Sequence, residues 1–175
     1  MNETTGWAVG DSGLILKTTN GGENWISSLA GNKPLRAFHF FDENTGVIVG
    51  GNTGTFYTGT SRLVIKTTNG GVNWHTIMNS TDVPFRNIQF VNDSVGLIGV
   101  NGVLKTTNKG DTWQYYGGIN SEYCFFLNEN TGYATSGSFP MIYKTTNGGI
   151  NWSIIYYTGM FNFSGGVFFC NLNTG

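Results

Sequence analysis

The sequence has 175 residues, of which 11% are charged, and its formal net charge is -1. A chain of this length can bury the core of one domain, whereas so weak a charge lacks the positive surface that nucleic-acid binding requires. Its 27 glycines against three prolines, and its 15% of aromatic residues, are typical of short strands joined by tight turns. The composition therefore predicts an all-β protein that does not bind nucleic acid.

Cysteine content and hydropathy exclude further classes. The two cysteines, Cys124 and Cys170, are too few for a disulfide framework, and no cysteine-histidine cluster has the spacing of a metal site. No apolar run approaches the roughly 20 residues of a membrane-spanning helix, and no export signal opens the sequence. We therefore expect no metal, no cofactor and no membrane span.

One nine-residue motif, the nonamer, occurs four times, and its spacing predicts the fold. Its lysine, at positions 17, 66, 105 and 144, recurs after 49, 39 and 39 residues, close to the ~40 to 45 residues of a four-stranded propeller blade. The longer first interval contains an insertion, Gly51 to Arg62. The four copies are KTTNGGENW at Lys17 to Trp25, KTTNGGVNW at Lys66 to Trp74, KTTNKGDTW at Lys105 to Trp113 and KTTNGGINW at Lys144 to Trp152.

A second motif keeps the same phase and consists of a phenylalanine and, six residues later, a glycine. It occurs at Phe40 to Gly46, Phe90 to Gly96, Phe126 to Gly132 and Phe169 to Gly175. Between the two markers, one repeat contains four predicted strands: Arg36 to Phe41, Val47 to Gly50, Leu63 to Thr67 and a last strand from Trp74. The order of strands and turns predicts an antiparallel four-stranded meander.

The third strand of each repeat is apolar on both faces just before the lysine. The residue pairs are Ile15-Leu16, Val64-Ile65, Val103-Leu104 and Ile142-Tyr143. A half-buried strand would alternate apolar and polar residues, so these sheets are predicted to be packed between other sheets, as blades are. The Asn-Gly-Gly segment that follows suggests a two-residue hairpin with positive φ.

The core of the nonamer, Thr18 to Trp25 in its first copy, resembles the Asp-box or bacterial neuraminidase repeat, Ser/Thr-x-Asp-x-Gly-x-Thr-Trp. Combined with the phenylalanine-glycine motif, it is most similar to photosystem II stability/assembly-factor-like propellers, over essentially the whole chain. The resemblance implies a β-propeller whose turns are shaped by Asn20, Gly22, Trp25, Asn69, Gly71, Trp74, Asn108, Gly110, Trp113, Asn147, Gly149 and Trp152. Asparagine replaces the acid in every copy; its amide still accepts a hydrogen bond, so we expect the turn to persist without the charge.

The repeat phase divides the chain into blades at 1–32, 33–82, 83–118 and 119–164, followed by a spare inner strand within 165–175. The first blade lacks its inner strand, the strand equivalent to Arg36 to Phe41. Three interpretations fit: the chain is an excerpt of a longer propeller, a ring closed by its own strand Val167 to Cys170, or a subunit that gives this strand to the next molecule. We favour the excerpt, because family members usually have more blades.

No catalytic set is evident. Most acidic residues fall in the turns of the repeat, and the remaining three, Asp11, Asp82 and Glu122, do not occupy equivalent positions that would suggest a carboxylate pair. The sequence therefore predicts a protein that is not an enzyme.

Candidate binding residues are the arginines and the insertion. Arg36 and Arg86 occupy one repeat position, and the family resemblance implies an arginine patch there; pairing with nearby backbone is the alternative. Arg62, Phe56 and Tyr57 belong to the insertion, and loops on rigid scaffolds often carry recognition.

Two further sets of residues recur with the repeat. The nonamer lysines, Lys17, Lys66, Lys105 and Lys144, are interpreted as solvated charges at the strand ends. The aromatic segments Tyr115-Tyr116 and Tyr156 to Phe163 follow the last strands and supply either contact surface or core.

Taken together, these features predict a non-enzymatic binding or scaffold propeller that recognises a protein or a glycan. We expect it to be secreted or surface-associated, with the periplasm as a further compartment. Two alternatives remain. The first is a structural subunit that assembles into a filament or oligomer through its C-terminal strand, and the second is a fragment of an Asp-box glycosidase.

Overall fold

The computed structural model describes residues 3–54, 59–121, 123–136, 141–157, 159 and 167–168. Phe56 and Tyr57 lie outside these ranges. Apart from one short 3-10 turn, η1 (Asp11–Gly13), the regular structure of the described residues is β. Within the same ranges, no helix has the length and apolar character needed to cross a membrane.

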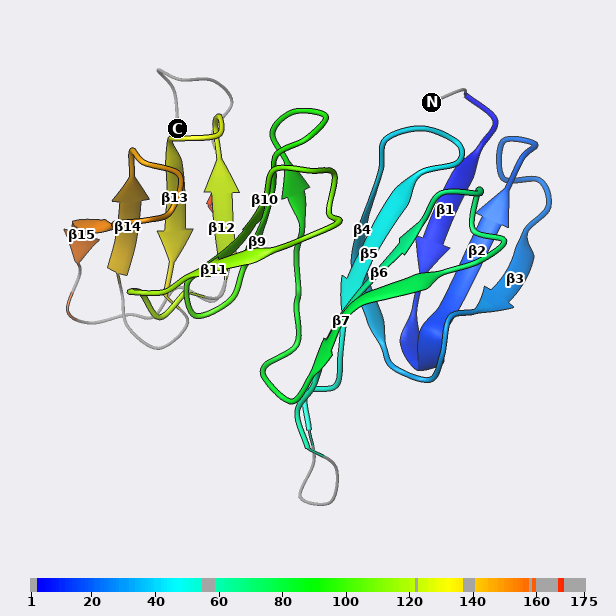
Figure 1. Cartoon of the computed structure of the whole chain (residues 1–175), viewed down its shortest axis with the longest axis horizontal. Helices are drawn as coiled ribbons and strands as arrows, with labels where there is room; N and C mark the ends of the chain where they lie inside the picture. The colour runs from blue at the N-terminus through cyan, green and yellow to red at the C-terminus, as the bar shows by residue number, and fades with distance from the viewer. Residues whose placement is uncertain are drawn as a thin grey trace. The chain divides into compact units, whose positions relative to one another are not determined.

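The strands form four antiparallel sheets in which neighbours in sequence are neighbours in space (Figure 1). The first sheet contains β1 (Gly6–Val9), β2 (Leu14–Thr18) and β3 (Ile26–Leu29). The second contains β4 (Leu35–Phe40), β5 (Gly46–Gly50), β6 (Arg62–Thr67) and β7 (His75–Ser80). The third contains β8 (Gln89–Phe90), β9 (Gly96–Gly99), β10 (Val103–Thr106) and β11 (Gln114–Tyr116), and the fourth β12 (Tyr123–Phe126), β13 (Gly132–Thr135), β14 (Met141–Thr145) and β15 (Ser153–Tyr157).

These sheets confirm the predicted all-β meander, including the first sheet of three strands. The chain divides into two compact units, Met1–Phe85 and Arg86–Gly175, each holding two sheets. In the predicted C-terminal strand, Val167 and Phe168 are described and are not in a strand, while the Phe168 ring lies 5.0 Å from that of Phe125. Phe169 and Cys170 lie outside the described residues.

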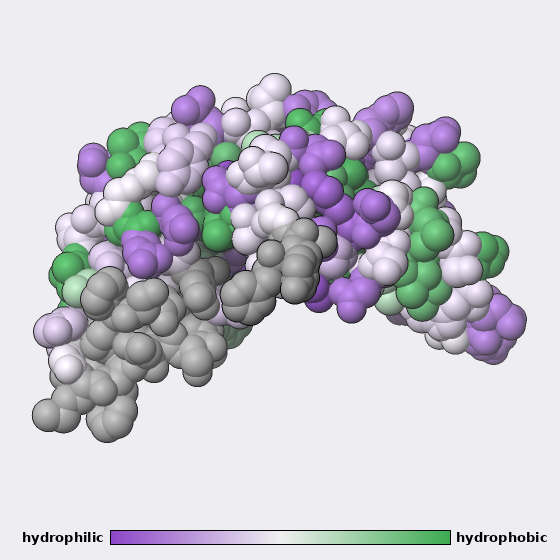
Figure 2. All heavy atoms as spheres, turned by 90° about the horizontal axis from the view of Figure 1, so that it is seen from below, coloured by the Kyte–Doolittle hydropathy of each residue, from purple (hydrophilic) through white to green (hydrophobic). Residues whose placement is uncertain are grey.

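Burial follows the order of strands in each sheet. The two middle strands of the second and third sheets are largely buried, as β5 and β6 show, whereas every residue of β3 and β15, the last strands of the first and fourth sheets, is exposed. Each unit has a core between its two sheets, formed in the first by Ile15, Leu35, Ile48, Leu63 and Ile65, and in the second by Val95, Leu97, Val103, Ile119, Cys124, Phe126, Ala134 and Tyr143. On the face seen in Figure 2, hydrophobic residues form small clusters among hydrophilic ones.

The phenylalanine-glycine motif is a packing unit within each four-stranded sheet. Phe126 on the inner strand is paired across the sheet with Gly132, and a Cβ at Gly132 would come within 2.5 Å of the Phe126 ring. The ring also meets the Trp152 indole edge to face at 5.9 Å. The glycine is therefore required because the ring occupies the space of a side chain.

The nonamer turn, defined as the eight residues from threonine to tryptophan, differs from the expected hairpin. Lys66 pairs with His75, so residues 67–74 form the connection instead of two residues. The Thr67 hydroxyl accepts hydrogen bonds from the amides of Asn69 and Gly71, at 3.3 and 2.9 Å, and Asn69 Oδ1 accepts one from the Asn73 amide at 2.9 Å. Side-chain oxygens thus satisfy backbone donors that a tight hairpin would pair directly.

Side chains also join neighbouring inner strands. Gln89 on β8 pairs with the backbone of Phe126 on β12, donating to its carbonyl and accepting from its amide at 2.8 Å each. Asn87 makes a similar link, donating to the Cys124 carbonyl at 3.2 Å and accepting from the Gly99 amide at 3.3 Å. Amide side chains therefore hold the third sheet to the fourth.

The interpretation of the nonamer lysines as solvated charges is wrong for one of them, and two others are half-exposed and bond to a neighbouring sheet. Lys66 is buried, with 7% of its surface exposed. Lys17 Nζ donates to the Gly70 carbonyl of the next sheet at 2.9 Å, and Lys105 Nζ donates to the Glu129 carbonyl of the next sheet at the same distance. The lysine bridges sheets because its long side chain reaches the neighbouring turn, a contact that periodicity within one strand does not reveal.

Candidate binding site

The structure places the three candidate arginines in different surroundings. Arg36, on β4, is exposed and lies 3.2 Å from the Asp11 carboxylate. Arg62 opens β6, is paired with Asp82, has 14% of its side chain exposed and lies 5.6 Å from the Phe85 ring centroid. Arg36 and Arg62 belong to the first unit, whereas exposed Arg86 belongs to the second. Little of Arg62 is left for a ligand, while Arg36 and Arg86 remain candidates.

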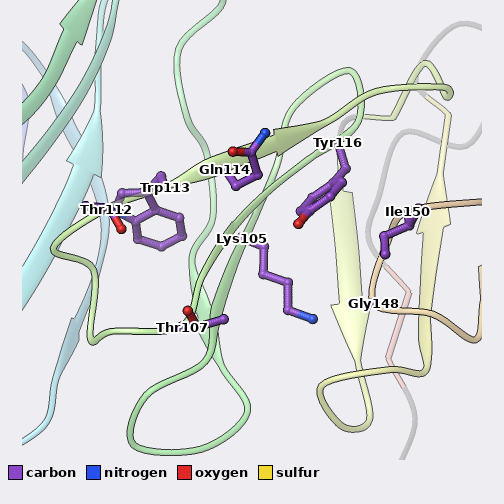
Figure 3. A pocket seen from close by; sticks show the side chains of 8 residues that line it. All are labelled: Lys105, Thr107, Thr112, Trp113, Gln114, Tyr116, Gly148 and Ile150. Carbon is purple, nitrogen blue, oxygen red and sulfur yellow. The ribbon is translucent and has the colours of Figure 1, made fainter.

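A groove of about 300 Å³ lies in the second unit, between the third sheet and the turn of the fourth (Figure 3). We call it the Tyr116 groove. Its lining combines an ammonium group, hydroxyls, an amide and two aromatic rings, from Lys105, Thr107, Thr112, Trp113, Gln114, Tyr116, Gly148 and Ile150. In Figure 3, the Lys105 and Tyr116 side chains extend into the same space.

The nonamer turn of the third sheet positions one side of the groove. Trp113 Nε1 donates to the Gly110 carbonyl at 3.1 Å, so the indole offers a ligand its ring surface. The ring also meets Phe90 edge to face at 6.2 Å, which holds its orientation. Asn108 accepts from the Thr112 amide at 3.0 Å and donates to the Thr112 hydroxyl at 2.9 Å. This wall is therefore preorganised by the repeat itself.

The chemistry of the groove comes from positions that differ between the repeats. Gln114 faces Lys105 across the β10–β11 pair, and Tyr116 faces Val103. At the equivalent places of the other sheets, the residue opposite the nonamer lysine is Ile26, His75 or Ser153. The residue at the register of Tyr116 is Ser28, Met78 or Tyr156. Thr112 likewise stands where the other three nonamers have asparagine.

The threonine at position 112 is the one departure from an otherwise constant residue that could have pointed to the groove from the sequence. Tyr116 was a candidate contact residue, but Gln114 was missed and Lys105 was assigned to solvent. Each of these residues has a counterpart in every repeat, so the sequence distinguishes it only when the copies are compared position by position.

The groove can bind but lacks the usual groups for hydrolysis. None of its lining residues is Asp or Glu, the pair that most glycoside hydrolases use. No cluster of three or more potential metal-ligating side chains occurs among the described residues. The thiol of Cys124 lies in the core, where burial raises its pKa to about 12, so it is a neutral group.

Comparison with known proteins establishes the fold. Neither a protein-family model nor a curated protein sequence matches the chain. A structure of YCF48 bound to D1 peptide is 18% identical, with a TM-score of 0.65, over 95% of this chain and 54% of that chain. YCF48 from Cyanidioschyzon merolae is 17% identical, with a TM-score of 0.68, over 96% of this chain and 57% of that one.

A GH74 enzyme described as ancestral is also similar, at 23% identity and a TM-score of 0.70, over 88% of this chain and 24% of that chain. The chain is therefore a β-propeller structure of four blades, the first of which has three strands. It spans little more than half the length of the YCF48 chains.

Proposed function

We propose that this chain is a non-catalytic binding propeller and that the Tyr116 groove holds a segment of a partner protein. The carrying observation is that the Trp113 ring, fixed by the repeat turn, lines one groove together with Thr112, Gln114 and Tyr116, which occupy positions that differ between the repeats. The turns and the core keep the same residues in each copy, so the positions that vary beside a fixed wall can set what the groove binds.

The lining suits a peptide. Trp113 supplies an apolar ring of fixed orientation and Tyr116 a second aromatic ring, while Gln114 supplies an amide that can bond a peptide backbone. The YCF48 structure with a D1 peptide is a precedent for peptide binding by a propeller of this fold. An extracellular or cell-surface location and filament assembly stay predictions.

Selection from a phage-displayed library of random dodecapeptides tests the proposal. The full chain is the bait, and the double variant Gln114→Ile, Tyr116→Ser is the counter-bait. This variant installs the residues that the first sheet has at the same register, Ile26 and Ser28, so it is compatible with the fold. We expect dodecapeptides that bind the wild type at least tenfold better than the double variant.

The control is Tyr157→Ser, which removes an exposed aromatic side chain of β15 outside the groove. It should bind the selected peptides as the wild type does. Equal binding to wild type and double variant would contradict the proposal. If the chain instead bound β-glucan oligosaccharides, and the double variant did not, the groove would be a glycan site.

A further inference from the structure

Resting on the proposed function, we infer that the partner segment is acidic and that Lys105 binds its carboxylate, next to an apolar or aromatic side chain held by Trp113. The inference begins with the position of the ammonium group. Lys105 Nζ is held by the Glu129 carbonyl at 2.9 Å, and a Cβ at position 148 would lie within 2.5 Å of Nζ. Gly148 thus leaves the space that the ammonium group fills. One of its three N–H donors is used in this way.

The equivalent lysine of the first sheet is satisfied differently. Lys17 also donates to a carbonyl of the next sheet, but its Nζ lies 4.7 Å from the ring centroid of Trp7, its cross-strand partner. The cross-strand partner of Lys105 is Leu97, which has no π face to attract a cation. Lys105 is therefore held at the groove without the aromatic contact that compensates Lys17.

The surroundings of Lys105 favour an anion from outside. No lining residue carries a negative charge, so nothing in the groove's lining competes for the ammonium group. The Tyr116 hydroxyl can donate to the second carboxylate oxygen, while the Trp113 ring and Ile150 offer apolar surface in the same groove. An Asp or Glu followed or preceded by an apolar or aromatic residue matches this arrangement.

The test uses the most enriched dodecapeptide from the selection, labelled with fluorescein, and its counterpart with every Asp and Glu changed to Asn and Gln. Fluorescence anisotropy gives Kd for wild type, Lys105→Met and Lys17→Met. Each variant removes one bond between neighbouring sheets, and Lys17→Met also removes the contact with Trp7, but only Lys105→Met removes the ammonium group of the groove.

We expect the amide counterpart to bind the wild type at least about tenfold more weakly, as for loss of a charge-assisted hydrogen bond. Lys105→Met should lose the same factor for the acidic peptide and none for the amide peptide, while Lys17→Met should match the wild type. Equal Kd for the two peptides, or equal losses in the two variants, would overturn the inference. Such a result does not affect the proposed function, which is tested separately. The proposed function is refuted only if no selected peptide loses affinity in the double variant Gln114→Ile, Tyr116→Ser.

Discussion

Replacing Gly132 with alanine places a methyl group in space that the Phe126 ring occupies. The new Cβ would lie 2.5 Å from two ring carbons, Cδ1 and Cε1, whereas carbon atoms pack at about 3.5 to 4.0 Å. The ring must therefore move by about 1 Å. It is 1% exposed and meets Trp152 at 5.9 Å, so it has little room to do so.

The expected cost combines two opposing terms. Overpacking a well-packed core costs about 1 to 3 kcal/mol, while alanine is favoured over glycine inside a strand by about 0.5 to 1 kcal/mol. The φ of Gly132 is not among the positive ones, so the backbone adds no strain. We expect Gly132→Ala to lower the free energy of unfolding by about 1.2 kcal/mol, the difference between the middles of the two ranges.

Urea unfolding followed by tryptophan fluorescence measures this loss. The matched control is Gly6→Ala in the first sheet, where no inner-strand phenylalanine faces the glycine and the nearest atom, Thr18 Cγ2, is 3.0 Å away. It should change the free energy of unfolding by less than about 0.5 kcal/mol. Adding Phe126→Leu to Gly132→Ala should recover part of the loss. Equal effects of the two glycine variants, or no coupling to Phe126, would refute the packing argument.

Three further predictions concern the turns and the core. Asn69→Ala should destabilise the chain by about 1 kcal/mol in urea unfolding, because the Asn73 amide loses its acceptor, whereas Asn69→Asp keeps an oxygen there and should stay within about 0.5 kcal/mol of wild type. Lys109 has a φ of +57°, where the other nonamers have glycine, so Lys109→Gly should raise the urea midpoint by the equivalent of about 0.5 to 1 kcal/mol; a lower midpoint would contradict the strain. Cys124 should resist alkylation by iodoacetamide at pH 8 until the chain unfolds. The pKa of the Cys124 thiol is about 12 in the folded chain against an ordinary value of 9.0. Its contribution to stability is therefore complete below pH 9 and falls by about 1.4 kcal/mol per pH unit as pH rises towards 12. The difference in unfolding free energy between wild type and Cys124→Ala should show this slope.

Much of the fold was predictable because its signals are local. The strands before each lysine and the glycines after each phenylalanine lie within one sheet, where neighbours in sequence pair directly, and the structure has them in the expected order. The hairpin between β6 and β7 was predicted too short, since Thr67 and Asn69 close a longer turn with their side chains. The Asn-Gly-Gly segment favours a tight turn, but the hydrogen bonds from side chains stabilise the longer one.

The candidate site was predictable only in part. Tyr116 stood out as an aromatic residue after a last strand, and Arg36 as a repeated arginine, but neither position indicates what lies opposite it. The role of Lys105 depends on Glu129 and Gly148 of the following sheet. Such contacts join residues of different repeats, and their geometry is invisible to a comparison of spacing.

The sequence by itself determined the blades, their order and the missing inner strand of the first, because each follows from a period that the chain repeats. The tertiary structure alone decided that Lys66 leaves solvent and that Arg62 is paired with Asp82. It also decided that Gln114 and Tyr116 share a groove with a neighbouring turn. The physical reason is that strand pairing acts within a repeat, whereas burial, charge compensation and cavity shape depend on how one sheet packs against the next.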